Sequence, residues 1–125
     1  MALHADYPNP VVVCSTTGTG VQPDILDIES VFFNVAGYPP VLQIIISATA
    51  TVVVNAAMQV SGATTPTMVD PVDVSGGGFT TSDFYDLIPG LRFYQINVTA
   101  NTGTVIVKAG FGQLLRMTTN ATFGL

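Results

Sequence analysis

Apolar and polar residues alternate along several short stretches of the chain. The clearest stretch covers residues 91–100, where every second residue from Tyr94 to Val98 is apolar and the residues between them are polar. A period of two is that of a strand with one buried face. Asn101-Thr102-Gly103 provides a turn, and residues 104–108 return as a second strand with Val105 and Val107 facing inward. The pattern predicts a β-hairpin.

Similar patterns predict further strands upstream of this hairpin. We expect them at residues 11–15, 25–35, 41–47, 51–60 and 67–74. Pro71 lies inside the last of these, which favours an edge strand because proline cannot donate a ladder hydrogen bond. Residues 48–50 are expected to bend, and loops are expected at 16–24, 36–40, 61–66 and 75–78. Residues 79–88 are predicted to hold one helical turn with Ser82 as its N-cap.

Seven or eight short strands separated by turns are typical of a β-sandwich. We therefore expect an all-β fold, a single antiparallel β-sandwich of the jelly-roll or Ig-like kind; a closed barrel is the alternative. Inward positions follow from the period of two within the β-branched runs. They are Val31, Phe33, Ile44, Ile46, Val52, Val54, Tyr94, Ile96, Val98, Val105 and Val107.

The two ends of the chain do not fit the sandwich pattern. Residues 1–10 are polar and contain prolines, which predicts an extended N-terminal arm, and residues 11–112 form the sandwich domain. Residues 113–125 are predicted to be a C-terminal arm or the last strand. Apolar side chains on such arms are best explained by docking, so we expect an interface there. Its predicted residues are Tyr7, Pro8, Pro10, Leu114, Leu115, Arg116, Met117, Phe123 and Leu125.

Charge is scarce and mostly negative. Charged residues make up 9% of the chain and its net charge is -5, against a charged fraction of about 25% in a typical soluble domain. An acidic chain with few Lys and Arg does not fit nucleic-acid binding or docking on anionic membranes. A surface so poor in charge indicates that partners cover much of it.

The uncharged stretch from Ser30 to Val69 raises the question of a membrane span. Residues 41–60 are long enough, but polar residues interrupt them and half of them are β-branched, which favours strands. The N-terminus has no apolar run and no Lys or Arg, so we expect no signal peptide and synthesis in the cytoplasm. The single cysteine, Cys14, excludes an internal disulfide.

Candidate catalytic and metal-binding residues are few. His4 is the only histidine and lies in the N-terminal arm, where nothing would hold it beside a nucleophile. Gly76-Gly77-Gly78 lacks the Gly-Lys-Ser/Thr of a phosphate-binding loop. The acids at 24, 27 and 29, at 70 and 73, and at 83 and 86 lack the spacing of a calcium loop. We expect no catalytic, cofactor-binding or metal-binding residues, and no enzyme.

Residues 89–107 carry a resemblance to a known family. The strand Pro89-Gly90-Leu91-Arg92-Phe93-Tyr94-Gln95-Ile96-Asn97-Val98-Thr99-Ala100, followed by Asn101-Thr102-Gly103-Thr104-Val105-Ile106-Val107, resembles the closing hairpin of small virion structural proteins of tailed bacteriophages. Ala50-Thr51-Val52-Val53-Val54 also fits their pattern. Leu87-Ile88-Pro89-Gly90 is similar to the start of strand F in fibronectin type III domains.

The phage resemblance implies a capsid decoration or cement protein. Such a protein would bind the major capsid protein or another virion protein, form a homo-oligomer on the shell, and be located in the virion. It would contact neither nucleic acid nor membrane. The alternative hypothesis is a host-recognition or adhesin-like module of a tail or fibre, which would bind glycans. The tyrosines of this chain are scattered and it has no tryptophan, which does not favour the aromatic platform that glycan binding uses.

Overall fold

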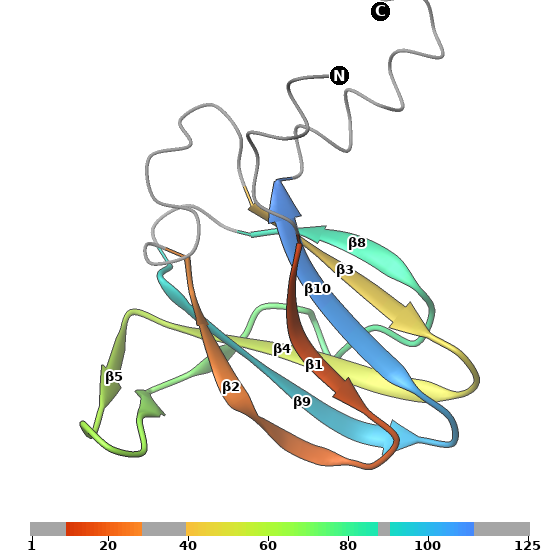
Figure 1. Ribbon diagram of the computed structural model, residues 1–125, viewed down its shortest axis with the longest axis horizontal. Helices are drawn as coiled ribbons and strands as arrows, with labels where there is room; N and C mark the ends of the chain where they lie inside the picture. Colours follow the sequence, from red (N-terminus) through yellow and green to blue (C-terminus); the bar gives the residue numbers. More distant parts are fainter. Residues whose placement is uncertain (1–9, 29–39, 88–90, 112–125) are drawn as a thin grey trace, which may run out of the picture.

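The computed structural model describes residues 10–28, 40–87 and 91–111, and these residues form an all-β sandwich (Figure 1). No helix with the length and apolar character needed to cross a bilayer occurs in these three ranges. The strands are β1 (Val11–Thr16), β2 (Gly20–Asp27), β3 (Pro40–Ile46), β4 (Ala50–Ala57), β5 (Gln59–Ser61), β6 (Thr67–Val69), β7 (Val72–Asp73), β8 (Asp83–Asp86), β9 (Phe93–Asn101) and β10 (Val105–Phe111).

The topology is that of one long antiparallel hairpin rolled into two layers. β1 pairs with β10, β2 with β9, β3 with β8 and β4 with β7, all antiparallel. Rolling this hairpin brings β10 against β3 and β9 against β4. The result is two four-stranded sheets with the orders β1-β10-β3-β8 and β2-β9-β4-β7. Two such sheets define a jelly roll, which is one of the two sandwich types that the sequence predicts.

A separate two-stranded sheet forms the tip of the rolled hairpin. β5 pairs with β6 through Gln59–Val69, Val60–Met68 and Ser61–Thr67. Figure 1 shows this small hairpin projecting from the sandwich. The sequence pattern predicts one strand over 51–60, where the structure has β4 and β5, and another over 67–74, where it has β6 and β7. The chain instead leaves the main sheet after Ala57 and returns to it at Val72.

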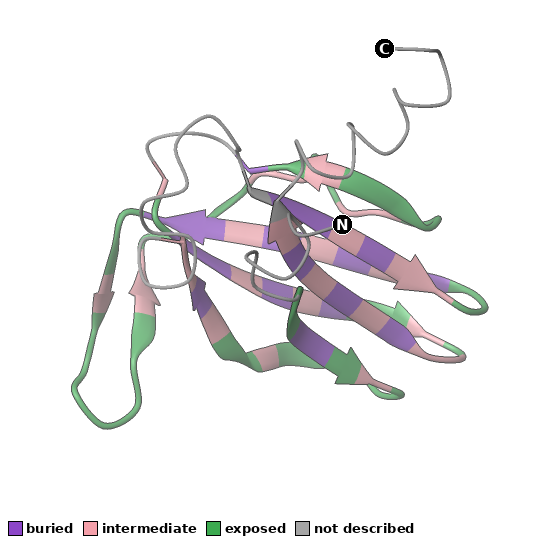
Figure 2. Ribbon diagram, turned by 45° about the horizontal axis from the view of Figure 1, so that its top comes forward, coloured by how far each residue is buried: buried purple, intermediate pink, exposed green. Residues whose placement is uncertain are grey.

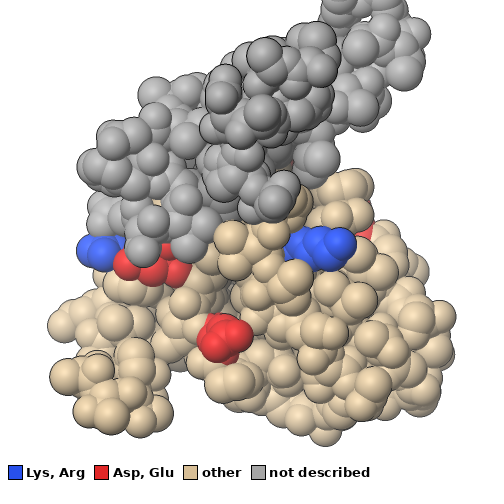
Figure 3. All heavy atoms as spheres, in the orientation of Figure 1, with Lys and Arg blue, Asp and Glu red and all other residues tan. Residues whose placement is uncertain are grey.

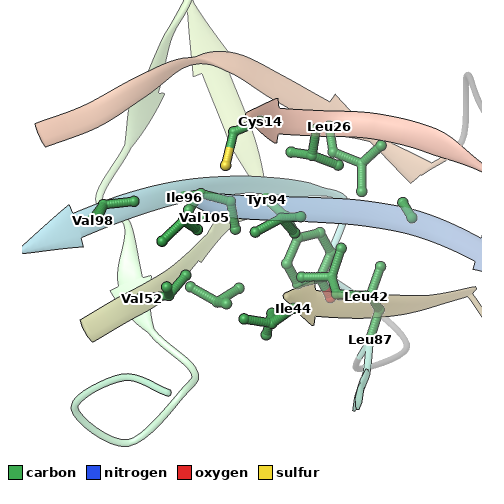
Figure 4. Close-up of a cluster of buried hydrophobic side chains, with 14 of the residues drawn as sticks. Cys14, Leu26, Leu42, Ile44, Val52, Leu87, Tyr94, Ile96, Val98 and Val105 are labelled. Atoms are coloured by element: carbon green, nitrogen blue, oxygen red, sulfur yellow. The ribbon is translucent and has the colours of Figure 1, made fainter. Parts of the chain in front are cut away.

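The core lies between the two four-stranded sheets. Buried and half-buried residues alternate along β4, β9 and β10, as Figure 2 shows. Ile44, Tyr94 and Val105 are among the buried side chains that fill the space between the layers (Figure 4). The core consists of Val13, Cys14, Leu26, Leu42, Ile44, Ala50, Val52, Val54, Ala56, Leu87, Tyr94, Ile96, Val98, Val105, Val107 and Ala109. Full burial of one such large side chain is worth about 1.5–3 kcal/mol.

The predicted core is confirmed at most positions. Ile44, Val52, Val54, Tyr94, Ile96, Val98, Val105 and Val107 are buried. Ile46, the last residue of β3, is only partly buried and packs against the edge of the cluster. Val31 and Phe33 lie outside the described residues. The edge position predicted from Pro71 is also confirmed, because β7 is the last strand of its sheet.

Two local predictions are wrong. Residues 83–86 form strand β8 instead of part of a helical turn, because Val41–Ile44 of β3 supply the backbone partners. Ser82 does not cap a helix; its hydroxyl accepts a hydrogen bond from the Ile46 N–H at 2.8 Å. The loop predicted over 16–24 is also shorter, since β2 begins at Gly20.

The predicted hairpin over residues 91–108 is also wrong. β9 and β10 are strands as expected, but they belong to different sheets and do not pair with each other. The turn at 102–104 is therefore an arch that crosses from one layer to the other. An Ig-like fold would place its last two strands side by side in one sheet, whereas in this fold each strand of the pair faces the other across the core.

Three arches stack at one end of the sandwich, at residues 17–19, 47–49 and 102–104. The 102–104 arch lies between the other two because β10 lies between β1 and β3. Asn101 ties it to the first arch: its side-chain amide donates to the Gly18 carbonyl at 3.0 Å, and its side-chain oxygen accepts from the Gly103 N–H at 2.9 Å.

The opposite side of the middle arch is held by hydroxyl groups. Thr102 donates its backbone N–H to the Thr49 carbonyl at 2.8 Å, and its hydroxyl accepts from the Thr49 N–H at 3.1 Å. The Ser47 hydroxyl accepts from the Thr104 N–H at 2.8 Å. Short polar side chains therefore replace the backbone partners that a hairpin would provide.

Candidate functional site

The open edge formed by β1 and β2 has exposed valines and a surface depression. These two strands begin the two sheet orders and are joined by the 17–19 arch, so they lie at the same edge of the sandwich. The depression has a volume of about 220 Å³. Its lining consists of Val11, Val12, Val13, Asp24, Ile25 and Leu26. Val12 is 52% exposed, and Val21, near the start of β2, is 61% exposed.

A bulge in β1 produces this exposure. Val12 pairs with Lys108 and Cys14 pairs with Val107, so Val13 is an extra residue without a partner on β10. A bulge changes the phase of the side chains. Val13 and Cys14 are consecutively buried, whereas Val11 and Val12 are consecutively exposed.

The Cys14 thiol lies in the core beneath this edge. Burial raises the pKa of Cys14 above its ordinary value, a backbone hydrogen bond at Val107 lowers it in part, and the nearby Asp24 carboxylate raises it further. Both the burial and the charge disfavour the thiolate. Cys14 therefore packs as a small apolar group and is not an activated nucleophile.

A larger irregularity in β2 places Asp24 beside the depression. Val21 pairs with Asn97, but the next pair is Ile25 with Gln95, so the residues between Val21 and Ile25 bulge outward. The Gln95 side-chain amide donates to the Gln22 carbonyl at 2.8 Å and fixes the bulge. The sequence supports this reading, because Pro23 cannot donate a ladder hydrogen bond.

The opposite edge, formed by β7 and β8, is closed by its own connection. Val52 and Phe79 exchange backbone hydrogen bonds at 2.9 and 2.8 Å, which brings the connecting segment onto β4. The Tyr85 hydroxyl donates to the Val74 carbonyl at 2.9 Å. The rings of Phe79 and Tyr85 meet edge to face with centroids 5.6 Å apart. Phe84 remains 54% exposed on this side.

Charged groups are few among the described residues on the face that Figure 3 shows. Arg92 and Asp27 form a two-point ion pair, with Nε–Oδ1 and Nη2–Oδ2 distances of 2.8 and 2.9 Å. The Arg92 guanidinium also lies 4.9 Å from the centroid of the Phe93 ring. Among the residues that the structure describes, no three His, Cys, Asp or Glu side chains are grouped so that they could hold a metal ion.

Of the predicted interface residues, only Pro10 lies within the described ranges. It is exposed, and its ring lies beside Gly110 of β10. Tyr7, Pro8, Leu114, Leu115, Arg116, Met117, Phe123 and Leu125 lie outside the described residues. Sequence reasoning missed Val11, Val12 and Asp24. The run Val11-Val12-Val13 does not signal the bulge, because Val52-Val53-Val54 is also a run of three valines and pairs with β9 without a break.

No family model, curated protein or solved structure matches the chain.

Proposed function

We propose that this chain is a non-enzymatic virion structural protein, specifically a capsid decoration or cement protein of a bacteriophage. It binds the major capsid shell through its sandwich surface and its terminal segments. The observation that carries the proposal is that the chain enters and leaves the sandwich at neighbouring positions. Val11 at the start of β1 pairs with Ala109 near the end of β10, and Pro10 lies beside Gly110.

Both terminal segments therefore start next to the exposed valines of the open edge. Residues 1–9 join at Pro10, and residues 112–125 follow Phe111. Together with the depression, they can form one continuous contact with a neighbouring protein. Many copies on a symmetric shell would turn weak single contacts into strong attachment through avidity.

The fold supports a binding role and leaves two kinds of partner. Jelly rolls occur in viral capsid proteins and in lectins, and a fold alone does not decide function. The resemblance of residues 89–107 to phage virion proteins favours the capsid. Residues 93–107 of that segment form β9, an arch and the start of β10, so the resemblance supports the proposal through the sequence and not through a shared hairpin.

Deletion of residues 113–125 tests the role of the C-terminal segment. The core cluster lies between Val13 and Ala109, so we expect the shortened protein to keep its circular dichroism spectrum and cooperative unfolding. We expect it to lose co-sedimentation with shells assembled from the major capsid protein of the same phage. The full chain should bind those shells at a fixed ratio and raise their melting temperature.

Two outcomes would contradict the proposal. A shortened protein that binds shells as the full chain does would remove the C-terminal segment from the interface. A full chain that ignores the shells but binds glycans on an array would favour the host-recognition module instead. The exposed Phe84 ring on β8 is the residue that favours this second function, and Phe84→Ala should then abolish glycan binding.

A further inference from the structure

β1 is the least protected of the four edge strands of the sandwich. The edge of β2 is interrupted by a bulge that contains Pro23. β7 has only two residues, and β8 has an aspartate at each end. β1 has six residues, Val11–Thr16, with no charge and no proline among them. Charges, prolines, bulges and short lengths are the devices that keep an edge from pairing with another chain. β1 carries one of these devices, the bulge at Val13, whereas β2 combines its bulge with Pro23 and two aspartates.

An edge of this kind binds an extended segment by strand addition. Its outward N–H and C=O groups supply main-chain hydrogen bonds, and an adjoining pocket selects alternate side chains. The depression lined by Val11, Val12 and Ile25 is that pocket. Among the described residues that line it, Asp24 alone is charged, so the partner that fits carries apolar side chains and a cation.

We propose that the β1 edge binds residues 113–118 of a second copy of this chain as an added antiparallel strand. Charge complementarity supports this choice. The sequence Leu114-Leu115-Arg116-Met117 places one arginine among large apolar residues, and Arg116 is the only charged residue after Lys108. Arg116 would pair with Asp24, and its apolar neighbours would pack against the exposed valines of β1.

The direction of the chain favours a second copy over the same copy. β10 ends at Phe111, beside the start of β1, since Val11 pairs with Ala109. Residues that continued directly from Phe111 along the free edge of β1 would run parallel to it. Parallel neighbours need a crossover connection of about a dozen or more residues, but only Gly112 separates Phe111 from Gln113. The segment of a second copy can approach β1 in the antiparallel direction.

This inference goes beyond the proposed function, because self-association can be measured without any shell. If the chain self-associates but does not bind shells, the proposed function fails and this inference stands. If the chain binds shells but stays monomeric, this inference fails and the proposed function stands.

A charge swap in the full chain tests the assignment. We expect the unmodified protein to self-associate in analytical ultracentrifugation. Asp24→Lys and Arg116→Glu should each raise the dissociation constant of self-association by at least about tenfold, because a close charge pair across an interface couples strongly. The double variant Asp24→Lys/Arg116→Glu should restore it to within about threefold of the original value. Circular dichroism confirms that each variant is folded, as expected for the exposed Asp24.

A second pair of variants tests the strand itself. Val12→Lys places a charge on the β1 edge and should weaken self-association by at least about tenfold. Val72→Lys, at a similarly exposed valine on the opposite edge, should leave it unchanged; the two valines are 52% and 54% exposed.

Three results would overturn the proposal. One is a chain that stays monomeric at every concentration tested. Another is a double variant that associates no better than the two single variants. The third is a loss of association with Val12→Lys but not with Arg116→Glu. This result would show that β1 binds a different segment, for example β1 of the second copy.

Discussion

Val98 and Val21 are valines on opposite faces of the same sheet, one facing the core and the other facing outward. Val98 lies in β9, is completely buried, and pairs with Gly20 of β2. Val21 is the next residue of β2 and is 61% exposed. The two valines belong to adjacent pairs of the same ladder, so they differ mainly in whether they face the core.

An aspartate at these two positions should therefore give opposite results. Val98→Asp leaves an unpaired charge in the core, which costs several kcal/mol, a large share of a typical stability of about 5–15 kcal/mol. We expect this variant to be unfolded by circular dichroism and Val21→Asp to unfold at a temperature close to that of the original protein. A folded Val98→Asp protein would show that the inward face is assigned wrongly.

Asp73 acts through hydrogen bonds in the glycine-rich loop. Its carboxylate accepts from the Ser75 hydroxyl at 2.6 Å, from the Ser75 N–H at 2.7 Å and from the Gly77 N–H at 2.9 Å. The hydrogen bond from the Ser75 side chain, followed by those from backbone N–H groups, lowers the pKa of Asp73 below its ordinary value. The loop predicted over residues 75–78 is therefore ordered by hydrogen bonds to one carboxylate.

The lowered pKa gives a sign for the pH dependence. Because the folded protein holds the Asp73 carboxylate more strongly than the unfolded chain does, it contributes stability above the ordinary pKa of 3.8. This contribution is lost as the pH falls from that value through the lower folded one. Urea unfolding at a series of pH values should show a shallower acid loss of stability in Asp73→Asn. An NMR titration midpoint of Asp73 at or above 3.8 would contradict the prediction.

At the scale of the element, the arch between β9 and β10 explains what periodicity finds and what it misses. The spacing of Tyr94, Ile96 and Val98 correctly identifies a strand with one buried face. The same period arises whether the next strand pairs beside it or crosses to face it. What selects the arch is contact with distant residues, Ser47 and Thr49 among them, which a local pattern does not contain.

The middle arch also imposes a close approach at Gly103. A Cβ at this position would lie 2.6 Å from the Ser47 hydroxyl oxygen and 2.8 Å from the Ala48 Cβ. We expect Gly103→Ala to lower the free energy of unfolding by about 1–3 kcal/mol, the usual cost of overpacking.

Gly18 is the matched control in the neighbouring arch. The nearest atom to a Cβ there is the Thr16 hydroxyl oxygen at 3.8 Å, an ordinary contact. Gly18→Ala should therefore change the stability by less than about 0.5 kcal/mol, as surface substitutions usually do. Equal effects of the two alanines in urea unfolding would show that the close approach at Gly103 relaxes without cost.

For the whole molecule, composition and periodicity predict the class of fold but not its winding. The all-β sandwich and eight of its central core residues follow from alternation within β-branched runs. The strand order does not, because it depends on pairs such as Val11 with Ala109, which lie at opposite ends of the chain. The β1–β2 edge was missed for a related reason: bulges in both strands shift the phase on which the prediction depends.

The rolled hairpin also sets the order in which the molecule can be completed. β4 pairs with β7 near the middle of the chain, whereas β1 pairs with β10. Among the described strands, β1 is made first and thus waits for β10, which is made last. Pairing between such distant segments slows folding, and until β10 has been made, the valines of β1 have no sheet to join. Each new chain therefore completes its sandwich only after β10 has been made.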